Sequence, residues 1–472
     1  ELAGGSPNIW VDSIWFDEPM RIASRPAALR IRLSHNSSAA VNGIPMNLSI
    51  NGDRVAIGTF NLVPGLDTDT VLRFNHGDAG IKEGVVSIED APIRFDDDWN
   101  FGFEVTDNIQ VTILSEQSSS ETAKSIQRVF GTANGLYNAE IHSRWTPELI
   151  AKSKLIILCD WDAQGSGFAL EIADFVRKGG SIVFLPKNGQ IADNELFDSL
   201  GLPSSGAWVE TDDRVRTLQL NHPFFQNMFA EFPERIDLPN AKRIWNRTVA
   251  SSEEILARTE LGRPFLSRCQ LDRGQAFIFH VSAEAESSNL TRHALWIPLL
   301  LRMAERAYAT PINAGEIGSL KRWTLAADVP NIGELKLTQS SSPSKTPSET
   351  NESAGDWLPE VRQVPGQIQV LLEGLSINPG HYVLRDQSQS WASIGLNQDR
   401  RESNHAAFSL AEYKSFIEKN GWNHVKVLSV TASSLPQVIE LSEQGVPLWK
   451  AFIIFALIAL AIETILLRTW KA

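Results

Sequence analysis

The sequence predicts a multidomain protein of mixed α/β and β class that ends in a transmembrane helix. Three observations support this prediction. Short alternating apolar runs fill residues 8–105, strands and helices alternate over 109–185, and an apolar segment whose only charge is Glu463 covers 451–467. Period-two alternation is typical of half-buried strands, whereas continuous apolar strands between helices are typical of a parallel sheet. An apolar segment of this length predicts a membrane span.

Composition limits the kinds of partner that we expect. The chain has 472 residues, which predicts about three domains. Its formal net charge is −13, which argues against a nucleic-acid partner because the nucleic-acid backbone is itself negative. The two cysteines, Cys159 and Cys269, lie far apart and lack metal-ligand spacing, so we expect no disulfide framework. Position 1 is Glu and no signal peptide is visible, so we expect a fragment or a processed chain.

Residues 1–107 are predicted to form an immunoglobulin-like β-sandwich. Turn signals such as Asn51-Gly52 separate the period-two runs, and this pair suits a type I′ turn because both residues tolerate positive φ. The runs lie at 29–33, 46–50, 55–60, 71–74 and 85–88. The cluster Asp96-Asp97-Asp98 could bind a cation, but it lacks the spaced oxygen ligands of a calcium loop. We therefore interpret it as a turn or a solvated edge.

Residues 108–309 are predicted to form a three-layer α/β domain. Strands are expected at 109–114, 139–141, 154–159, 181–185 and 275–281, and helices at 119–130, 168–178 and 290–308. Ser119 or Ser120 suits the N-cap of the first helix, and Gly179-Gly180 ends the second. Apolar strands that alternate with helices indicate a parallel sheet covered on both faces.

Residues 310–405 are predicted to form a second β-rich module, a small sandwich. Its segment 339–356 is dominated by Ser, Thr, Pro and Glu, which predicts a disordered loop. Strands are expected at 367–372 and 381–384, on either side of the turn Asn378-Pro-Gly380. Residues 406–446 are predicted to hold a helix at about 409–419 and a juxtamembrane connector.

Residues 447–472 are predicted to form a transmembrane helix and a short tail. The apolar run of about 17 residues spans roughly 25 Å as a helix, enough to cross a hydrocarbon core. Trp449 and Trp470 flank it, where interfacial aromatic residues belong. A buried C-terminal core helix is the alternative, although such a helix is seldom apolar on every face.

Charges near the span predict its orientation. Arg468 and Lys471 follow it and Lys450 precedes it, so the tail is expected in the cytoplasm. The rest of the chain would then lie on the extracytoplasmic side of the inner (plasma) membrane. Within the span, Glu463 either reaches the interface or contacts another membrane helix.

Several polar residues follow the strands of the α/β domain, at the edge where such folds bind ligands. The candidates are Cys159, Asp160, Asp162, Lys187, Asn188 and, as a base, His280. A glutamine-amidotransferase-like fold would place a nucleophilic Cys on a strand-to-helix turn with glycines around it. The corresponding turn after Leu185 is Pro186-Lys-Asn-Gly189, which has no Cys or Ser.

We interpret the remaining candidates as structural residues. Cys159 ends an apolar strand without a basic neighbour, which predicts a buried, inert thiol. Asp160 and Asp162 lack an accompanying His or carboxylate, so they are expected to cap the helix near 168 or lie in a solvated loop. His280 is expected to be a core histidine. The sequence therefore predicts no catalytic residue, no metal and no cofactor.

Six segments carry a resemblance to a known bacterial family. They are residues 11–19, 88–100, 175–184, 288–298, 394–404 and the terminal helix with Glu463. Together they resemble the C-terminal part of the BatA-like, aerotolerance-regulator-type membrane proteins, nearly throughout the chain and in order. The resemblance implies a degenerate class I glutamine-amidotransferase-like domain. It also implies that membrane helices and a von Willebrand A-type region with a metal-dependent adhesion motif would lie upstream of Glu1.

The expected function is that of a non-enzymatic, membrane-anchored extracytoplasmic scaffold that binds other proteins. The resemblance implies von Willebrand A-type proteins and a MoxR-type ATPase as partners, in envelope integrity or stress tolerance. One alternative is a membrane-tethered hydrolase that uses Asp160, Asp162 and His280. The other is a glycan- or peptide-binding module in which Trp99, Trp208 or Trp357 lines a groove.

Overall fold

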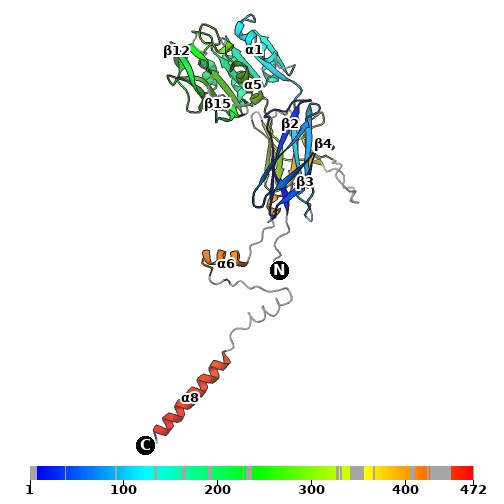
Figure 1. Cartoon of the computed structure of the whole chain (residues 1–472), viewed down its shortest axis with the longest axis vertical. Helices are drawn as coiled ribbons and strands as arrows, with labels where there is room; N and C mark the ends of the chain where they lie inside the picture. Colours follow the sequence, from blue (N-terminus) through cyan, green and yellow to red (C-terminus); the bar gives the residue numbers. More distant parts are fainter. Residues whose placement is uncertain are drawn as a thin grey trace. The chain divides into compact units, whose positions relative to one another are not determined.

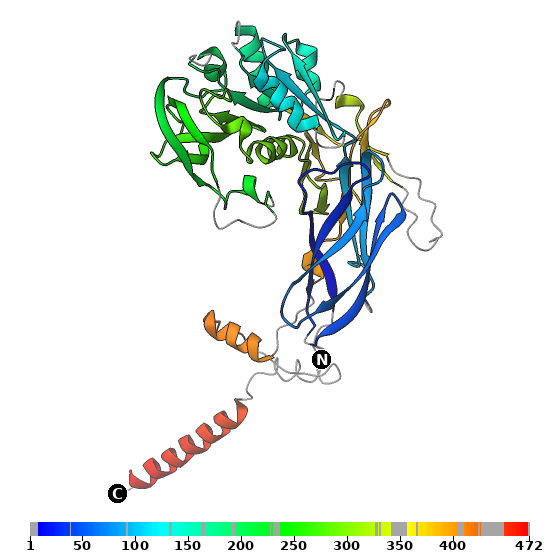
Figure 2. The same cartoon turned by 45° about the horizontal axis from the view of Figure 1, so that its top comes forward.

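The computed structural model divides the chain into two units, a larger one over Asn8–Ser403 and a smaller one that includes residues 404–472 (Figure 1). The described residues are 8–37, 39–90, 93–131, 135–161, 166–189, 194–226, 228–229, 237–325, 329, 332–340, 356–364, 367–403, 410–422, 425 and 448–470. Within the larger unit, β-strands in several sheets predominate, and the long strands of the first module are blue in Figure 2.

The first β module consists of two antiparallel sheets. One has the order β1-β2-β5, and the other has the order β4-β3-β6-β7. The strands are β1 (Ile9–Phe16), β2 (Pro26–His35), β3 (Val41–Ile50), β4 (Asp53–Leu62), β5 (Thr68–Asn75), β6 (Gly80–Ile88) and β7 (Asp98–Val105). Inward residues of both sheets, among them Leu29 and Val86, belong to one buried cluster. All five predicted runs lie in strands, and Asn51 and Gly52 have the positive φ that the turn requires.

The α/β region contains a nine-stranded sheet with the order β13-β12-β14-β15-β16-β11-β10-β8-β9. Five strands are parallel, namely β8 (Ile109–Leu114), β9 (Tyr137–His142), β10 (Leu155–Cys159), β11 (Ser181–Leu185) and β16 (Gly274–Phe279). The other four pair in antiparallel fashion, namely β12 (Gly206–Leu218), β13 (Asn240–Arg247), β14 (Glu253–Thr259) and β15 (Pro264–Leu271). The prediction of a parallel sheet is confirmed for five strands. It is wrong for the other four, which pair in antiparallel fashion; β15, for example, is joined to β16 by the tight turn at Asp272-Arg273.

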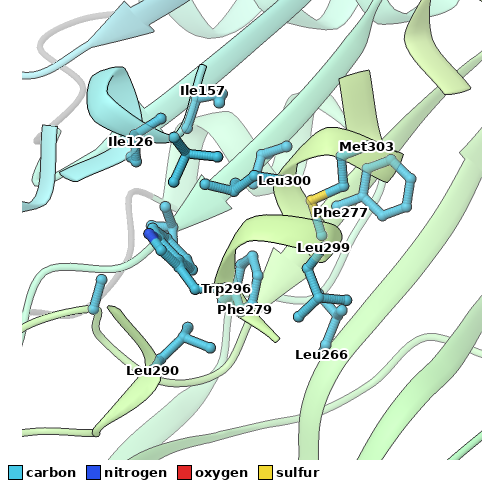
Figure 3. Close-up of a cluster of buried hydrophobic side chains, with 14 of the residues drawn as sticks. Ile126, Ile157, Leu266, Phe277, Phe279, Leu290, Trp296, Leu299, Leu300 and Met303 are labelled. Carbon is cyan, nitrogen blue, oxygen red and sulfur yellow. The ribbon is translucent and has the colours of Figure 1, made fainter. Parts of the chain in front are cut away.

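Helices cover both faces of this sheet. α1 (Glu121–Gly131) and α5 (Trp296–Ala307) contribute to one buried cluster, whereas α2 (Pro147–Lys152), α3 (Ser166–Arg177) and α4 (Asn194–Ser199) contribute to the other. β10 is apolar throughout because its alternate residues enter opposite clusters. Figure 3 shows Ile157 of β10 in the same buried cluster as Trp296 and Leu300 of α5. The helix predicted at 290–308 is in fact a 3-10 turn, η2 (Leu290–Arg292), followed by α5.

The second β module has a five-stranded sheet, β17-β24-β23-β19-β20, and a three-stranded sheet, β18-β22-β21. The strands are β17 (Ala314–Glu316), β18 (Arg322–Leu325), β19 (Lys336–Gln339), β20 (Asp356–Trp357), β21 (Val361–Val364), β22 (Gln367–Leu371), β23 (Gly380–Arg385) and β24 (Ser390–Asn397). Residues from both sheets share one buried cluster around Tyr382. The predicted loop 339–356 lies almost entirely outside the described residues.

Backbone-to-backbone packing joins the two β modules. Gly102 of β7 and Asn313 exchange two hydrogen bonds of 2.8 Å. The side-chain amide of Asn397 accepts through Oδ1 from the Asn100 backbone N–H at 2.6 Å. Its Nδ2 donates to the Asn100 carbonyl oxygen at 2.9 Å. His381 contacts the carbonyl oxygen of Gly84 at 2.9 Å. These contacts bind β24 and β23 directly to β6 and β7.

The smaller unit contains α6 (Leu410–Lys419) and α8 (Trp449–Thr469). α6 confirms the helix predicted at 409–419. α8 has 21 residues, and among the described residues it is the one helix long and apolar enough to cross a membrane. None of its side chains is buried, so α8 is not a core helix of the described structure. The chain therefore carries an apolar C-terminal helix suited to a single membrane anchor.

Candidate functional site

The order of the parallel strands identifies where an α/β sheet of this kind would bind a ligand. Across the sheet the five parallel strands lie in the order β9, β8, β10, β11 and β16. Along the chain these strands are the second, first, third, fourth and fifth. The order reverses between β8 and β10, and open α/β sheets bind ligands outside the carboxyl ends of the strands at such a switch point. In this protein the switch point contains Ser115, Cys159 and Asp160.

Asp160 lies beside the N-terminus of α1. It has a φ of 50°, and its carboxylate accepts a hydrogen bond of 2.7 Å from the Ser120 hydroxyl. Ser120 is the N-cap of α1, because its side-chain oxygen accepts from the Ala123 N–H at 3.2 Å. A helix N-terminus favours negative charge. Asp160 is therefore bonded at the start of α1, instead of at the helix near 168 or in a solvated loop as predicted, whereas Asp162 lies outside the described residues.

Cys159 cannot act as a nucleophile in this position. Its side chain is fully buried in the cluster beneath α1 and α5. Burial is the largest cause that raises the pKa of the thiol, the nearby Asp160 charge adds to it, and the Ser115 hydroxyl opposes it. The thiol therefore stays protonated at neutral pH, which confirms the interpretation of a buried thiol.

The turn after β11 is covered by an arginine that the sequence analysis did not consider. Arg243 of β13 donates a hydrogen bond of 3.1 Å from Nη1 to the Asn188 side-chain oxygen. The same guanidinium lies within 3.4 Å of the position that a Cβ on Gly189 would take. Lys187 and Asn188 thus lie beside a cation from an antiparallel strand. The turn presents no nucleophile of its own.

His280 belongs to a buried polar network. Its Nε2 lies 3.0 Å from the Ser267 hydroxyl oxygen, and this hydroxyl donates to Glu253 Oε2 at 2.9 Å. Glu253 in turn pairs with Arg247, and both side chains are fully buried. Burial first, and the charge of Arg247 second, lower the pKa of His280 to about 3. The imidazole is therefore neutral at physiological pH.

The proton arrangement in this network differs from that of a catalytic triad. Ser267 has a single hydroxyl proton and donates it to Glu253, so His280 must donate from Nε2 to the serine oxygen. The serine lies in the middle, whereas a catalytic triad needs the histidine there. This geometry supports the interpretation of His280 as a core histidine. Sequence reasoning missed Arg247, Glu253 and Ser267, because β13, β14 and β15 contain several other polar residues from which a buried one does not stand out.

Replacement of His280 should affect stability and not turnover. We expect His280→Ala to lower the free energy of unfolding by about 2–4 kcal/mol, because it opens a cavity and leaves Ser267 without its donor. Thermal denaturation of the purified full chain in detergent measures this loss. His142→Ala, on the edge strand β9, is the matched control and should change little. Hydrolase activity that His280→Ala abolishes would contradict the structural role.

The cluster Asp96-Asp97-Asp98 begins in a turn, as predicted, but it is not a solvated edge. Asp96 is fully buried, Asp97 is partly buried and only Asp98 is exposed. Arg400 reaches this turn from the end of the second β module and donates to the carbonyl oxygens of Asp96 at 3.1 Å and Asp98 at 2.8 Å. Its guanidinium also lies over the Trp99 ring, 5.0 Å from the ring centre. The cluster is thus part of a packed junction.

The three tryptophans considered for a binding groove lie in three different cores. Trp99 is 7% exposed in the first β module. Trp208 packs against the cluster that contains α3. Trp357 packs edge-on against Tyr382 in the second β module, with ring centres 5.5 Å apart. Because the three side chains do not share a surface, they do not form a common groove.

A cavity of about 830 Å³ lies at the opposite end of the parallel strands from the switch point. Lys154, Ser181 and Gln275 line it at the amino ends of β10, β11 and β16. Two of its cations are engaged by protein groups, since Lys178 pairs with Asp174 at 3.0 Å and Arg268 pairs with Glu254 at 2.8 Å. Among the described residues, no three His, Cys, Asp or Glu side chains converge in a way that could hold a metal ion.

Comparison with known proteins gives distant structural similarity. No family model matches the chain. No curated protein matches it either. A ThuA-like protein from Parabacteroides merdae is 14% identical, with 43% of this chain and 90% of that chain covered and a TM-score of 0.33. A cytoplasmic protein from Salmonella typhimurium LT2 is 12% identical (42% and 98% covered, TM-score 0.32). The CARDB domain of a Pyrococcus furiosus protein is 14% identical (21% and 95% covered, TM-score 0.19).

Proposed function

We propose that this chain is a non-enzymatic, membrane-anchored scaffold that binds other proteins on the extracytoplasmic side of the bacterial inner membrane. The observation that carries the proposal is the switch point of the parallel sheet, where Asp160 bonds to the N-cap of α1 and Cys159 is buried. An α/β sheet whose own side chains fill its ligand edge is suited to a structural role. The unburied apolar helix α8 supplies the anchor.

The arrangement of the larger unit supports a specific domain assignment within this proposal. The shared core of β1–β7 supports an immunoglobulin-like sandwich. The five parallel strands, with no Cys or Ser on the turn after β11, support a glutamine-amidotransferase-like domain without catalytic residues. The two sheets of β17–β24 support a second, smaller sandwich.

The family resemblance supplies the proposed biological setting. Two of the segments that carry it, 88–100 and 394–404, contact each other through Asn100 and Asn397 and through Asp96 and Arg400. The two segments that resemble the BatA-like family thus meet at one junction between the β modules. This supports the family resemblance more strongly than either segment alone. The partners would then be von Willebrand A-type proteins and a MoxR-type ATPase, in envelope integrity or stress tolerance.

Affinity capture tests the scaffold. The tagged full chain, solubilised from membranes, should retain a von Willebrand A-type protein and a MoxR-type ATPase through salt washes. A matched variant, Asp53→Asn at the exposed start of β4, should capture the same partners. Recovery of neither partner, together with a turnover that His280→Ala removes, would favour the hydrolase alternative.

A charge placed in the middle of α8 should detach the chain from the membrane. We expect Leu460→Arg to cost about 3 kcal/mol of insertion free energy, because Leu460 lies near the middle of the 21-residue helix. The fraction of chain that remains in alkali-washed membranes measures the effect. Thr469→Arg introduces the same side chain at the helix end and should remain membrane-bound. Equal retention of both variants would show that α8 does not span the bilayer.

A further inference from the structure

The two ends of the larger unit meet at the acidic turn before β7. Asn8 and Ser403 are its first and last residues, and both side chains are fully buried. The Asn8 amide N–H₂ donates to Asp96 Oδ2 at 2.7 Å and to the Ser403 carbonyl oxygen at 2.9 Å. We call Asn8, Asp96, Asp97, Arg400 and Ser403 the entry corner, since the chain enters and leaves the unit there.

Four oxygen atoms of the entry corner, and the Nε of Arg400, are buried without a hydrogen-bond partner among the described residues. The oxygen atoms are the possible ligands. They are Asn8 Oδ1, Asp96 Oδ1, Asp97 Oδ1 and Ser403 Oγ. Native structures seldom leave buried oxygen atoms unsatisfied, because each one loses its hydration on folding. Several such atoms, on three segments that touch one another, need either a donor or a cation.

Arg400 does not neutralise the carboxylates directly. Its Nη atoms donate to the backbone carbonyl oxygens of Asp96 and Asp98, and no ion pair within the described part of the chain joins it to Asp96 or Asp97. One guanidinium therefore faces four carboxylates, those of Asp96, Glu316, Asp98 and Asp97. The entry corner keeps an excess of negative charge, which a divalent cation would balance.

We propose that the entry corner binds a divalent cation of the calcium type. The ligands would be the carboxylates of Asp96 and Asp97, the amide oxygen of Asn8 and the hydroxyl of Ser403. Such a set is composed of hard oxygen donors, which Ca²⁺ prefers, and it offers neither thiolate nor imidazole for zinc. The proposed ligand set has only two carboxylates, and its other oxygen atoms are neutral. It is therefore compatible with the finding that no three Asp, Glu, His or Cys side chains converge among the described residues.

Calcium binding by the full chain in detergent tests the proposal. After treatment with EDTA, the chain is dialysed against ⁴⁵Ca²⁺, and its thermal unfolding is followed with CaCl₂, with MgCl₂ and with neither. We expect one bound Ca²⁺ and a higher unfolding temperature at pH 8 than without cation. Asp97→Asn and Ser403→Ala should each weaken the affinity about tenfold or more. Asp53→Asn, at the exposed start of β4, should bind as the unaltered chain does.

Two results would overturn the proposal. One is an unaltered chain that binds no Ca²⁺ at millimolar concentration and unfolds at the same temperature in CaCl₂ and EDTA. The other is Ca²⁺ binding that Asp97→Asn and Ser403→Ala leave unchanged, since the cation would then lie elsewhere. Asp97 is partly exposed, so its isosteric replacement by Asn should fold. Direct binding to the unaltered chain decides the matter even if a variant does not fold.

Discussion

Gly395→Ala is expected to destabilise the larger unit by about 3 kcal/mol or more, at the upper end of what overpacking costs. A Cβ on Gly395 of β24 would lie 2.0 Å from the carbonyl carbon of Asn100 and 2.1 Å from its oxygen. Both atoms belong to the backbone of β7, so no side-chain rotation relieves the overlap. The strands must move apart, which stretches the hydrogen bonds between Asn397 and Asn100.

Thermal or denaturant unfolding of the full chain in detergent measures this loss. Gly102→Ala should act in the same way, because its Cβ would lie 2.1 Å from the Ser393 carbonyl oxygen. Gly131→Ala, at the end of α1, is the matched control, since a Cβ there meets nothing within 4 Å. We expect this control to be neutral or to stabilise by less than about 1 kcal/mol. Equal unfolding midpoints for Gly395→Ala and Gly131→Ala would show that the β modules are not packed as described.

Local patterns predicted the strands and helices because local physics determines them. The period-two runs of the first β module and the five parallel strands of the α/β region were found from their patterns of apolar residues. β12–β15 were missed because their residues alternate less regularly and include Arg247 and Glu253, which point into the core. A charged residue on a strand is predicted to be exposed to solvent unless its ion-pair partner is known. Glu253 lies only six residues after Arg247, but the two residues belong to β14 and β13, which are separated by β12 in the sheet, so strand alternation does not reveal the pair.

The entry corner shows the same limit for a binding site. Asp96-Asp97-Asp98 was visible as an acidic run, but a calcium loop is recognised by ligands at fixed spacing within one segment. Here the further oxygen atoms come from Asn8 and Ser403. These residues are 395 positions apart in the sequence, yet a hydrogen bond joins them. Only the fold brings these ends together. The candidate residues at the switch point, by contrast, were placed correctly at the strand ends, because parallel strands align their carboxyl ends.

Arg247→Ala is expected to lower the free energy of unfolding by about 3–5 kcal/mol, the range for removal of one partner from a buried ion pair. Both Arg247 and Glu253 are fully inaccessible to solvent. Without the arginine, the Glu253 carboxylate keeps only the hydrogen bonds from Ser267 and from the Ala250 N–H. The guanidinium also donates to the Pro203 carbonyl oxygen at 2.7 Å and packs over the rings of Phe197 and Trp245. Its removal therefore opens a cavity as well.

An exposed pair supplies the control for this prediction. Arg32 and Asp69 lie on β2 and β5 at 2.8 Å, with about two fifths of each side chain exposed. Water and salt screen such a pair, so Arg32→Ala should cost about 1 kcal/mol or less. Denaturant unfolding of both variants in detergent gives the comparison. Similar losses for Arg247→Ala and Arg32→Ala would mean that water reaches the Arg247 site.

A double replacement separates the charge from the packing. Arg247→Met with Glu253→Leu removes both charges and keeps apolar volume, so it should be less destabilising than Arg247→Ala alone. Ser267 and His280 would then form a neutral pair, which needs no ionised partner. If the double variant were the least stable of the set, the ion pair would itself stabilise the fold. If it approached the unaltered chain, burial of the unpaired Glu253 would account for the cost of the single change.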